Sequence, residues 1–84
     1  MKAKYIIVDD RGLDLAIIFN PILNHSDFKV MAEGIGTITS AGFCHILIGS
    51  DLEPTVRCYG DSVTLKLSSR PERDAQAIKT GFRT

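Results

Sequence analysis

The sequence predicts a small α+β domain: an antiparallel β-sheet, made of an N-terminal hairpin and a β-meander, with one C-terminal helix packed on one face. Stretches rich in β-branched residues alternate with Gly, Asp, Asn and Pro from residue 4 to residue 67, as in a run of short strands. A helix-capping motif then begins at Ser69 and opens an amphipathic segment. The 84 residues are enough for a single domain, residues 1–84, which buries about 60% of the surface of its unfolded chain.

The first two strands are expected at Lys4–Val8 and Leu15–Phe19. Asp9–Gly12 supplies residue types from which turns are built, and a connection of about six residues is in the range of hairpins. The two strands should therefore pair antiparallel. Asn20-Pro21 ends the second strand, because proline lacks the amide that a strand ladder requires.

A short helical turn is expected within residues 24–32, where helix-capping side chains precede apolar residues at helical spacing. Gly34 and Gly36 should end it, since both can adopt a positive φ at little steric cost. The next extended stretch, Ile35–Ile48, is interrupted by the small residues Ser40–Gly42. We expect one bent strand or two short strands there, with a bulge or a close backbone approach at the interruption.

Two further strands, Thr55–Tyr59 and Ser62–Leu67, complete a three-stranded meander after the turn-rich loop at residues 49–54. Because side chains alternate across a strand, one face of this meander collects apolar residues that we assign to the core. These residues are Cys44, Ile46, Ile48, Val56, Cys58, Val63, Leu65 and Leu67.

The C-terminal helix carries the strongest local signal in the chain. Ser69 and Glu72 fit the capping box, in which the serine oxygen accepts a backbone amide while the glutamate accepts the serine amide. Gly81 can supply a left-handed stop. One apolar stripe should lie on the sheet, with the ring of Phe82 as its main anchor. The stripe consists of Pro71, Ala75, Ile78 and Phe82.

Composition argues against several classes of function. The net charge is zero, from 10 basic and 10 acidic residues, which disfavours a general phosphate binder and removes one barrier to self-association. No apolar run approaches the roughly 20 residues of a membrane span, so we expect no membrane association. Two cysteines are too few for a disulfide-dense secreted scaffold, and no signal peptide precedes them. We therefore expect a cytoplasmic protein.

The side chains that zinc prefers are present, but their spacing does not match a zinc site. Cys44 and His45 are adjacent on a strand, so their side chains point to opposite faces. A disulfide between Cys44 and Cys58 is compatible with neighbouring strands, while two free buried thiols are the interpretation that we favour. The four candidate ligands are His25, Cys44, His45 and Cys58.

Other candidate sites are equally incomplete. Asp9, Asp10 and Asp14 cluster at the first turn and carry the hard oxygens that divalent cations take, but solvated turn residues give the same pattern. A cysteine nucleophile would need a neighbouring base, and Gly34 and Gly36 lack the third glycine of a dinucleotide site. We therefore predict no enzymatic activity, no metal site and no cofactor.

The pattern does indicate a surface for another molecule. A single sheet with one short helix rarely covers both of its faces. Phe43, Leu47 and Tyr59 alternate with the expected core residues and should lie exposed on the second face. We predict a non-enzymatic protein-interaction module that uses this face, or an edge strand, to bind a protein partner or a second copy in a homodimer.

A small-ligand or nucleic-acid binding domain is the alternative. A small ligand would occupy a cleft near Asn24–Asp27, with His25 as a polar contact. Nucleic acid would bind a basic patch in the last 24 residues, although Glu72 and Asp74 dilute its charge and a platform of exposed aromatic side chains is missing. The basic residues are Lys66, Arg70, Arg73, Lys79 and Arg83.

Four segments resemble those of short uncharacterised proteins from phage and prophage genomes, namely Asn24–Phe28, Ser40–Cys44, Tyr59–Ser62 and Ser69–Ala75. These segments are mostly turns and caps, and they carry no catalytic residues. The resemblance implies a small phage accessory protein, of a kind that often acts by binding a host protein, including host defence complexes. Such a protein would act in the cytoplasm of a bacterial host.

Overall fold

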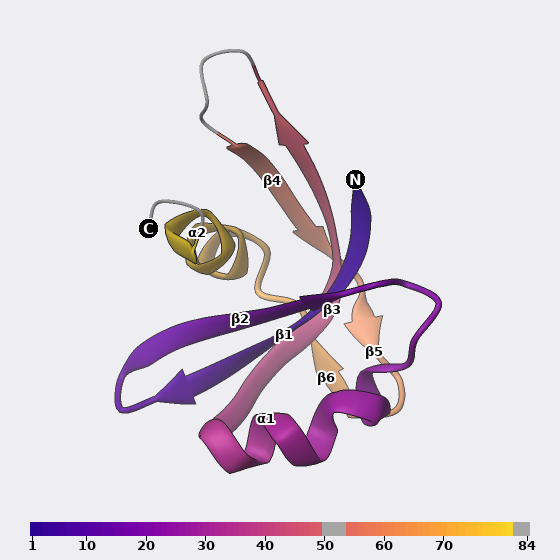
Figure 1. The fold of residues 1–84 in the computed structure, drawn as a ribbon, viewed down its shortest axis with the longest axis vertical. Helices are drawn as coiled ribbons and strands as arrows, with labels where there is room; N and C mark the ends of the chain where they lie inside the picture. The colour runs from indigo at the N-terminus through magenta and orange to yellow at the C-terminus, as the bar shows by residue number, and fades with distance from the viewer. Residues whose placement is uncertain (50–53, 82–84) are drawn as a thin grey trace.

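The computed structural model describes residues 1–49 and 54–81, and within them it confirms the α+β fold. The strands are β1 Lys2–Asp10, β2 Leu13–Phe19, β3 Thr37–Ile48, β4 Pro54–Tyr59, β5 Asp61–Ser62 and β6 Leu67–Ser68; the helices are η1 His25–Phe28, α1 Lys29–Ile35 and α2 Pro71–Gly81. Strands β1 to β4 form one antiparallel sheet in the order β2-β1-β3-β4 (Figure 1), and β5 pairs with β6 in a second, smaller sheet. Helix α2 packs on the large sheet against β2 and β4. None of the helices in the described ranges has the length and hydropathy of a membrane span.

The first two strands form the predicted hairpin, with a tighter turn than expected. They extend to Asp10 and Leu13, which leaves only Arg11 and Gly12 in the loop. Both loop residues have positive φ, 55° and 90°, as a two-residue hairpin loop of the primed type requires. The Oδ1 of Asp9 accepts the amide of Gly12 at 2.8 Å and closes the turn.

The third strand is one long bent strand with a bulge, which lies one residue before the small residues Ser40–Gly42 where it was expected. Ile7 pairs with Ser40 and Val8 pairs with Ile38, so Thr39 is an extra residue on the β3 side of the pairing. An extra residue of this kind bends the strand and increases its twist.

The glycines of this region behave differently from one another. A Cβ at Gly42 would lie 2.6 Å from the carbonyl oxygen of Tyr59, so the close backbone approach predicted for the small residues lies here. The expectation of positive φ at Gly34 and Gly36 is wrong: Gly34 lies inside α1 and Gly36 is extended, with φ −178°. Ile35, expected to open the strand, is instead the last residue of α1.

The segment between β2 and β3 is helical, as its capping pattern predicted. The amide of Asn24 donates to Oδ2 of Asp27 at 2.8 Å, at the start of η1, and α1 follows directly. Ala32 is fully buried against the sheet, whereas Val30 and Met31 are exposed. The helical segment therefore covers part of the sheet with one narrow face and leaves apolar side chains on the other.

The prediction of a third meander strand at Ser62–Leu67 is wrong. Gly60, with φ 75°, turns the chain away from the sheet after β4, and Ser62 then pairs with Leu67 in the separate β5–β6 hairpin. Leu65 and Leu67 pack against the sheet face that α1 also contacts, whereas Val63 is 84% exposed. Burial of the two leucines over β3 thus replaces the extension of the sheet beyond β4.

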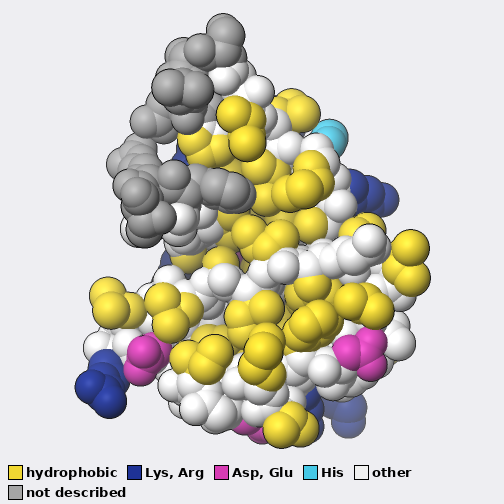
Figure 2. All heavy atoms as spheres, viewed as in Figure 1, with side chains coloured by type: hydrophobic (Ala, Val, Ile, Leu, Met, Phe, Trp, Pro, Cys, Tyr) yellow, Lys and Arg dark blue, Asp and Glu magenta, His cyan; other side chains and the backbone are white. Residues whose placement is uncertain are grey.

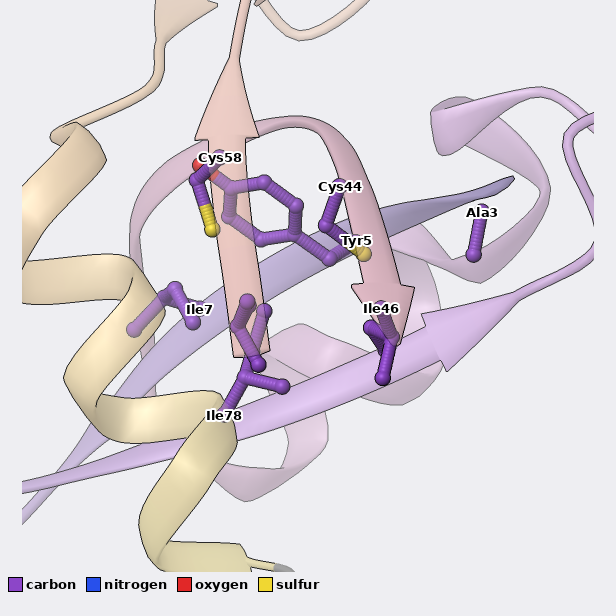
Figure 3. Close-up of a cluster of buried hydrophobic side chains, with 8 residues drawn as sticks. Ala3, Tyr5, Ile7, Cys44, Ile46, Cys58 and Ile78 are labelled. Atoms are coloured by element: carbon purple, nitrogen blue, oxygen red, sulfur yellow. The ribbon is translucent and has the colours of Figure 1, made fainter. Parts of the chain in front are cut away.

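The core has two layers, one on each face of the sheet, where the sequence predicted one. Alternation along β1 separates them, because Tyr5 and Ile7 face α2 while Ile6 and Val8 face α1. The layer under α2 (Figure 3) consists of Ala3, Tyr5, Ile7, Cys44, Ile46, Val56, Cys58 and Ile78. The layer under α1 consists of Ile6, Val8, Phe19, Ala32 and Ala41. The second face is therefore covered in part by α1 and the β5–β6 hairpin, and is not open along its whole length.

The start of α2 departs from the predicted capping box. The amide of Ser69 donates to the carbonyl oxygen of Gly60 at 3.0 Å, so it is not available to Glu72, which is exposed. The residue before the helix, Arg70, has its amide bound by the carboxylate of Asp74 at 2.8 Å. A side chain one turn into the helix thus caps it in place of the predicted pair.

The buried face of α2 is centred on Asp74 and Ile78, which are one turn apart. Ile78 points into the layer of side chains from the strands (Figure 3). Of the predicted stripe, Ala75 packs beside Ile78, but Pro71 is exposed. Phe82, the expected anchor, lies outside the described residues. Ile48, which was also assigned to the core, is 68% exposed near the end of β3.

Candidate functional site

The carboxylate of Asp74 is fully buried at the centre of a network that joins α2 to the sheet. Its Oδ2 accepts the Tyr5 hydroxyl at 2.6 Å and the Arg70 amide at 2.8 Å, and its Oδ1 accepts the Ser40 hydroxyl at 2.8 Å. The Arg70 guanidinium lies 3.1 Å from Oδ1 and also donates to the Thr39 hydroxyl at 3.1 Å.

This network has the properties of a structural element and not of an acid–base site. Burial and the bond to Asp74 together raise the pKa of the Tyr5 phenol, which keeps it protonated as a donor. A general acid or base must reach the substrate, and the Asp74 side chain has no exposed surface. The sequence predicts only that Asp74 dilutes the charge of the basic segment, because a carboxylate one turn from an arginine gives no sign of burial.

Cys44 and Cys58 face each other across β3 and β4 as free, buried thiols, which confirms the favoured interpretation. Burial raises the pKa of Cys44 to about 11 and that of Cys58 to about 12. A thiol nucleophile needs thiolate character and access to its substrate, and this pair has neither.

His25 is buried between two aromatic rings. Its ring lies edge-on to Phe19 and Phe43, with centroids 5.5 and 6.0 Å away. Its Nε2 is 2.9 Å from the carbonyl oxygen of Gly42, and because a carbonyl only accepts, Nε2 carries the proton. Burial lowers the pKa of His25, and the nearby ammonium of Lys4 lowers it further. A cavity of about 210 Å³ lies beside the ring, but His25 already has a backbone partner, so its role as a ligand contact stays a prediction.

The three aspartates of the first turn each have their own partner. Asp9 accepts a backbone amide of its own turn, and Asp10 lies 3.9 Å from the Arg11 guanidinium. Asp14 accepts two bonds from Arg73, at 2.8 and 3.2 Å, and this pairing lowers the pKa of its carboxyl. Within residues 1–49 and 54–81 no three His, Cys, Asp or Glu side chains are grouped as metal ligands would be.

Two members of the predicted nucleic-acid patch are engaged by carboxylates. Arg70 belongs to the Asp74 network, and Arg73 forms the bidentate pair with Asp14. Their charge is therefore partly neutralised inside the molecule. The other members are Lys66 on the β5–β6 turn, Lys79 on α2, and Arg83, which lies outside the described residues.

An exposed patch lies on β3 and β4, at the end of the sheet that projects away from α1 (Figure 1). Residues directly opposite each other in an antiparallel pairing share a face. Phe43 is opposite both Lys4 on β1 and Tyr59 on β4, and His45 is opposite both Lys2 and Arg57. We call this set the cation–aromatic patch: Lys2, Lys4, Phe43, His45, Leu47, Arg57 and Tyr59.

The patch combines stacked rings with aliphatic and cationic groups. The rings of Phe43 and Tyr59 stack with centroids 5.8 Å apart, and Nζ of Lys4 lies 5.8 Å from the Phe43 centroid. Tyr59 is 43% and Leu47 is 56% exposed, as alternation predicted, whereas Phe43, which was also expected to be exposed, is half-buried. A hollow of about 310 Å³ lies against Leu47 and Arg57. The binding role predicted for these residues stays a prediction.

A second apolar surface, which is not among the surfaces predicted from the sequence, follows the outer edge of β2. A groove of about 630 Å³ is lined there by β2 residues, by Ile35 of α1 and by Ala77 of α2. Figure 2 shows hydrophobic side chains gathered on both sides of β2 where it crosses the molecule. The composition of Leu13–Phe19 could have predicted this surface, because the side chains on both faces of the strand are apolar except for Asp14.

Comparisons with models of protein families, with curated proteins and with solved structures found no match to this chain. The function is therefore inferred from the surfaces and side chains described above.

Proposed function

We propose that this chain is a non-enzymatic protein-interaction module that binds a partner protein through the cation–aromatic patch. The observation that carries this proposal is the exposure of Leu47 and Tyr59 on a part of the sheet that lies beyond α1. Tyrosine and arginine are enriched among the residues that dominate binding energy at interfaces, and Arg57 lies beside these two. The half-buried ring of Phe43 stacks against the ring of Tyr59 from the neighbouring strand.

The charge of the patch indicates the chemistry of the partner. Lys2, Lys4 and Arg57 share its face, and the paired residues that define the patch include no carboxylate. A partner that presents acidic side chains around an apolar one would match both features, and complementary charge would speed its association. The whole chain carries no net charge, so the attraction is local to this face.

The partner that fits best is a protein of a bacterial host. The resemblance to phage and prophage proteins supports this assignment, with a component of a host defence complex as the target. The two free thiols that face each other across β3 and β4 support a reducing compartment, which the bacterial cytoplasm is. Buried Asp74 and inaccessible thiols support a role without catalysis.

Affinity capture from a bacterial lysate tests the proposal when it is combined with a patch variant. The double variant L47A/Y59A removes the exposed apolar contacts and leaves Phe43 in place. A protein retained by the wild type should be lost by this variant, because truncation of two central contacts costs about 2 kcal/mol or more each. Val30→Ala is the matched control, since Val30 is 83% exposed on α1, outside the patch.

The outcome depends on how the two variants differ. Loss in L47A/Y59A with retention in V30A, and unchanged folding of both by circular dichroism, supports binding through the patch. Equal retention by all three proteins, or equal loss in both variants, rejects it. Retention should also fall with added salt, because the cations of the patch take part.

Nucleic-acid binding by the C-terminal segment has less support, because Arg70 and Arg73 are held by carboxylates. Charge reversal at Arg70 would also disturb the buried network, so Lys66 and Lys79 are the positions to change. Salt-dependent binding of a single-stranded oligonucleotide by the wild type, weakened in K66E/K79E, would establish this alternative in place of the protein partner.

A further inference from the structure

The outer edge of β2 is available for pairing with another strand. β2 is the terminal strand of the sheet, and no backbone group of the described residues hydrogen-bonds to its outer side. The groove along this edge is mainly apolar, with Ile35 on one side and Ala77 on the other. Leu13 and Leu15 project there and are 66% and 39% exposed.

The two edges of the sheet differ in their protection. β4 begins with Pro54, which has no amide to donate, and carries the cationic side chain of Arg57. These are the devices that discourage pairing at a sheet edge. β2 has no proline, lysine or arginine, and its one charge, Asp14, is already paired with Arg73 at 2.8 Å. An edge of this composition is suited to strand addition.

We propose that β2 pairs antiparallel with β2 of a second copy, which joins the two sheets into one across a two-fold axis. The register that pairs the whole of Leu13–Phe19 is centred on Ala16, where two small side chains meet at the axis. Leu15 then lies opposite Ile17 of the second copy, so apolar side chains face each other on the α1 side of the sheet. Exposed apolar surface in both grooves is covered by the same contact.

The charges of the chain favour a second copy as the occupant. Two copies do not repel each other as whole molecules, because the net charge is zero. In the register centred on Ala16, the two Asp14 carboxylates are separated by about 14 Å, at about 3.4 Å per residue. A register centred on Asp14 would place like charges directly opposite, which is unfavourable. Of these two registers, the one centred on Ala16 pairs the whole strand and keeps the two Asp14 carboxylates apart.

Light scattering during size-exclusion chromatography tests this pairing in the intact chain, over concentrations from about 1 µM to about 1 mM. The wild type should be dimeric at the upper end, and L15K should be monomeric throughout, because a lysine is placed on the pairing edge. L47K is the matched control: it makes the same change on the cation–aromatic patch and should dimerise like the wild type. The β2 interface does not include the patch, so failure of one proposal leaves the other standing.

Amide hydrogen exchange supplies a second measurement that does not depend on a variant. Amides of Leu13–Phe19 that point away from β1 should exchange more slowly at high than at low protein concentration, while those of β4 should not change. A wild type that is monomeric at every concentration overturns the proposal, as does a dimer that persists in L15K. Dissociation by L47K alone would assign the dimer to the patch and would equally overturn pairing through β2.

Discussion

The phenol oxygen of Tyr5 lies 2.6 Å from Oδ2 of Asp74, and this bond ties β1 to α2 across 69 positions of the sequence. The same carboxylate accepts the hydroxyl of Ser40 on β3, so one side chain fixes the helix to two strands. Helix α2 has few large apolar side chains in its described part, and Ile78 is the one that is fully buried. Hydrogen bonds therefore contribute more to the position of this helix than they do in a helix that is held by an apolar face alone.

Removal of this carboxylate should strongly destabilise the fold. Asp74→Ala leaves the buried hydroxyls of Tyr5 and Ser40 without an acceptor, and at about 1–3 kcal/mol for each unpaired group this costs about 2–6 kcal/mol in total. The free energy of unfolding, measured by urea denaturation, should fall by that amount. Glu72→Ala, at an exposed position of the same helix, should change it by less than about 0.5 kcal/mol. A loss below about 1 kcal/mol for Asp74→Ala would contradict the role assigned to the network.

Stability should also decrease in mild acid because of His25. Burial holds its pKa below the ordinary value of 6.5, so the unfolded chain takes up a proton first as the pH falls. The contribution of His25 is therefore fully present above pH 6.5 and is lost as the pH falls toward the folded pKa, at up to about 1.4 kcal/mol per pH unit. Urea denaturation between about pH 7.5 and about pH 5.5 measures this slope, in a range where ordinary carboxyl groups hardly titrate.

Two variants assign that slope to its source. His25→Gln keeps a donor that can reach the Gly42 carbonyl but cannot take up a proton, so its stability should depend less on pH. His45→Gln is the matched control, because its side chain is exposed and should leave the slope of the wild type unchanged. The same slope in the wild type and in His25→Gln would show that His25 is not responsible.

Local patterns predicted the elements of this fold better than its layers. The hairpin of β1 and β2 follows from turn residues and alternation, and the irregularity of β3 follows from the small residues Ser40–Gly42; both signals act over a few positions. The alternation at residues 62–67 has the same form but ends in a different structure, because Leu65 and Leu67 pack against the buried cluster on the sheet face instead of extending the sheet. Whether residues 62–67 pack on the sheet face or extend the sheet depends on the space between α1 and β3, and a local sequence pattern does not predict that space.

The sequence also predicted only part of each candidate surface. Exposure of Leu47 and Tyr59 follows from alternation with Ile46 and Cys58. The cations of the patch were missed, since Lys2 and Lys4 reach this face only through the pairing of β1 with β3. The open edge of β2 depends on strand order, which is a property of the whole chain.

The two thiols should be unreactive in the folded protein. Cys44 and Cys58 are buried and their pKa values are raised to about 11 and about 12, so thiolate is scarce near neutral pH. Labelling with a thiol-specific reagent at about pH 8 should be negligible in the native state and should reach both residues in denaturant. Rapid native labelling of either cysteine would show that β3 and β4 separate readily. Cys58→Ser, as a comparison, would identify which residue reacts.

A pair of glycine substitutions tests the close approach of β3 to the end of β4. A Cβ added at Gly42 would lie 2.6 Å from the carbonyl oxygen of Tyr59, a backbone atom that can move only with its strand. Gly42→Ala should therefore cost about 1–3 kcal/mol of unfolding free energy, as overpacking does. Gly34→Ala meets nothing within 4 Å in α1, and it should stabilise the protein by about 0.5–1 kcal/mol because alanine favours a helix. Thermal denaturation of both variants measures the opposite shifts, and a neutral or stabilising Gly42→Ala would mean that β3 and the Tyr59 backbone lie further apart in solution.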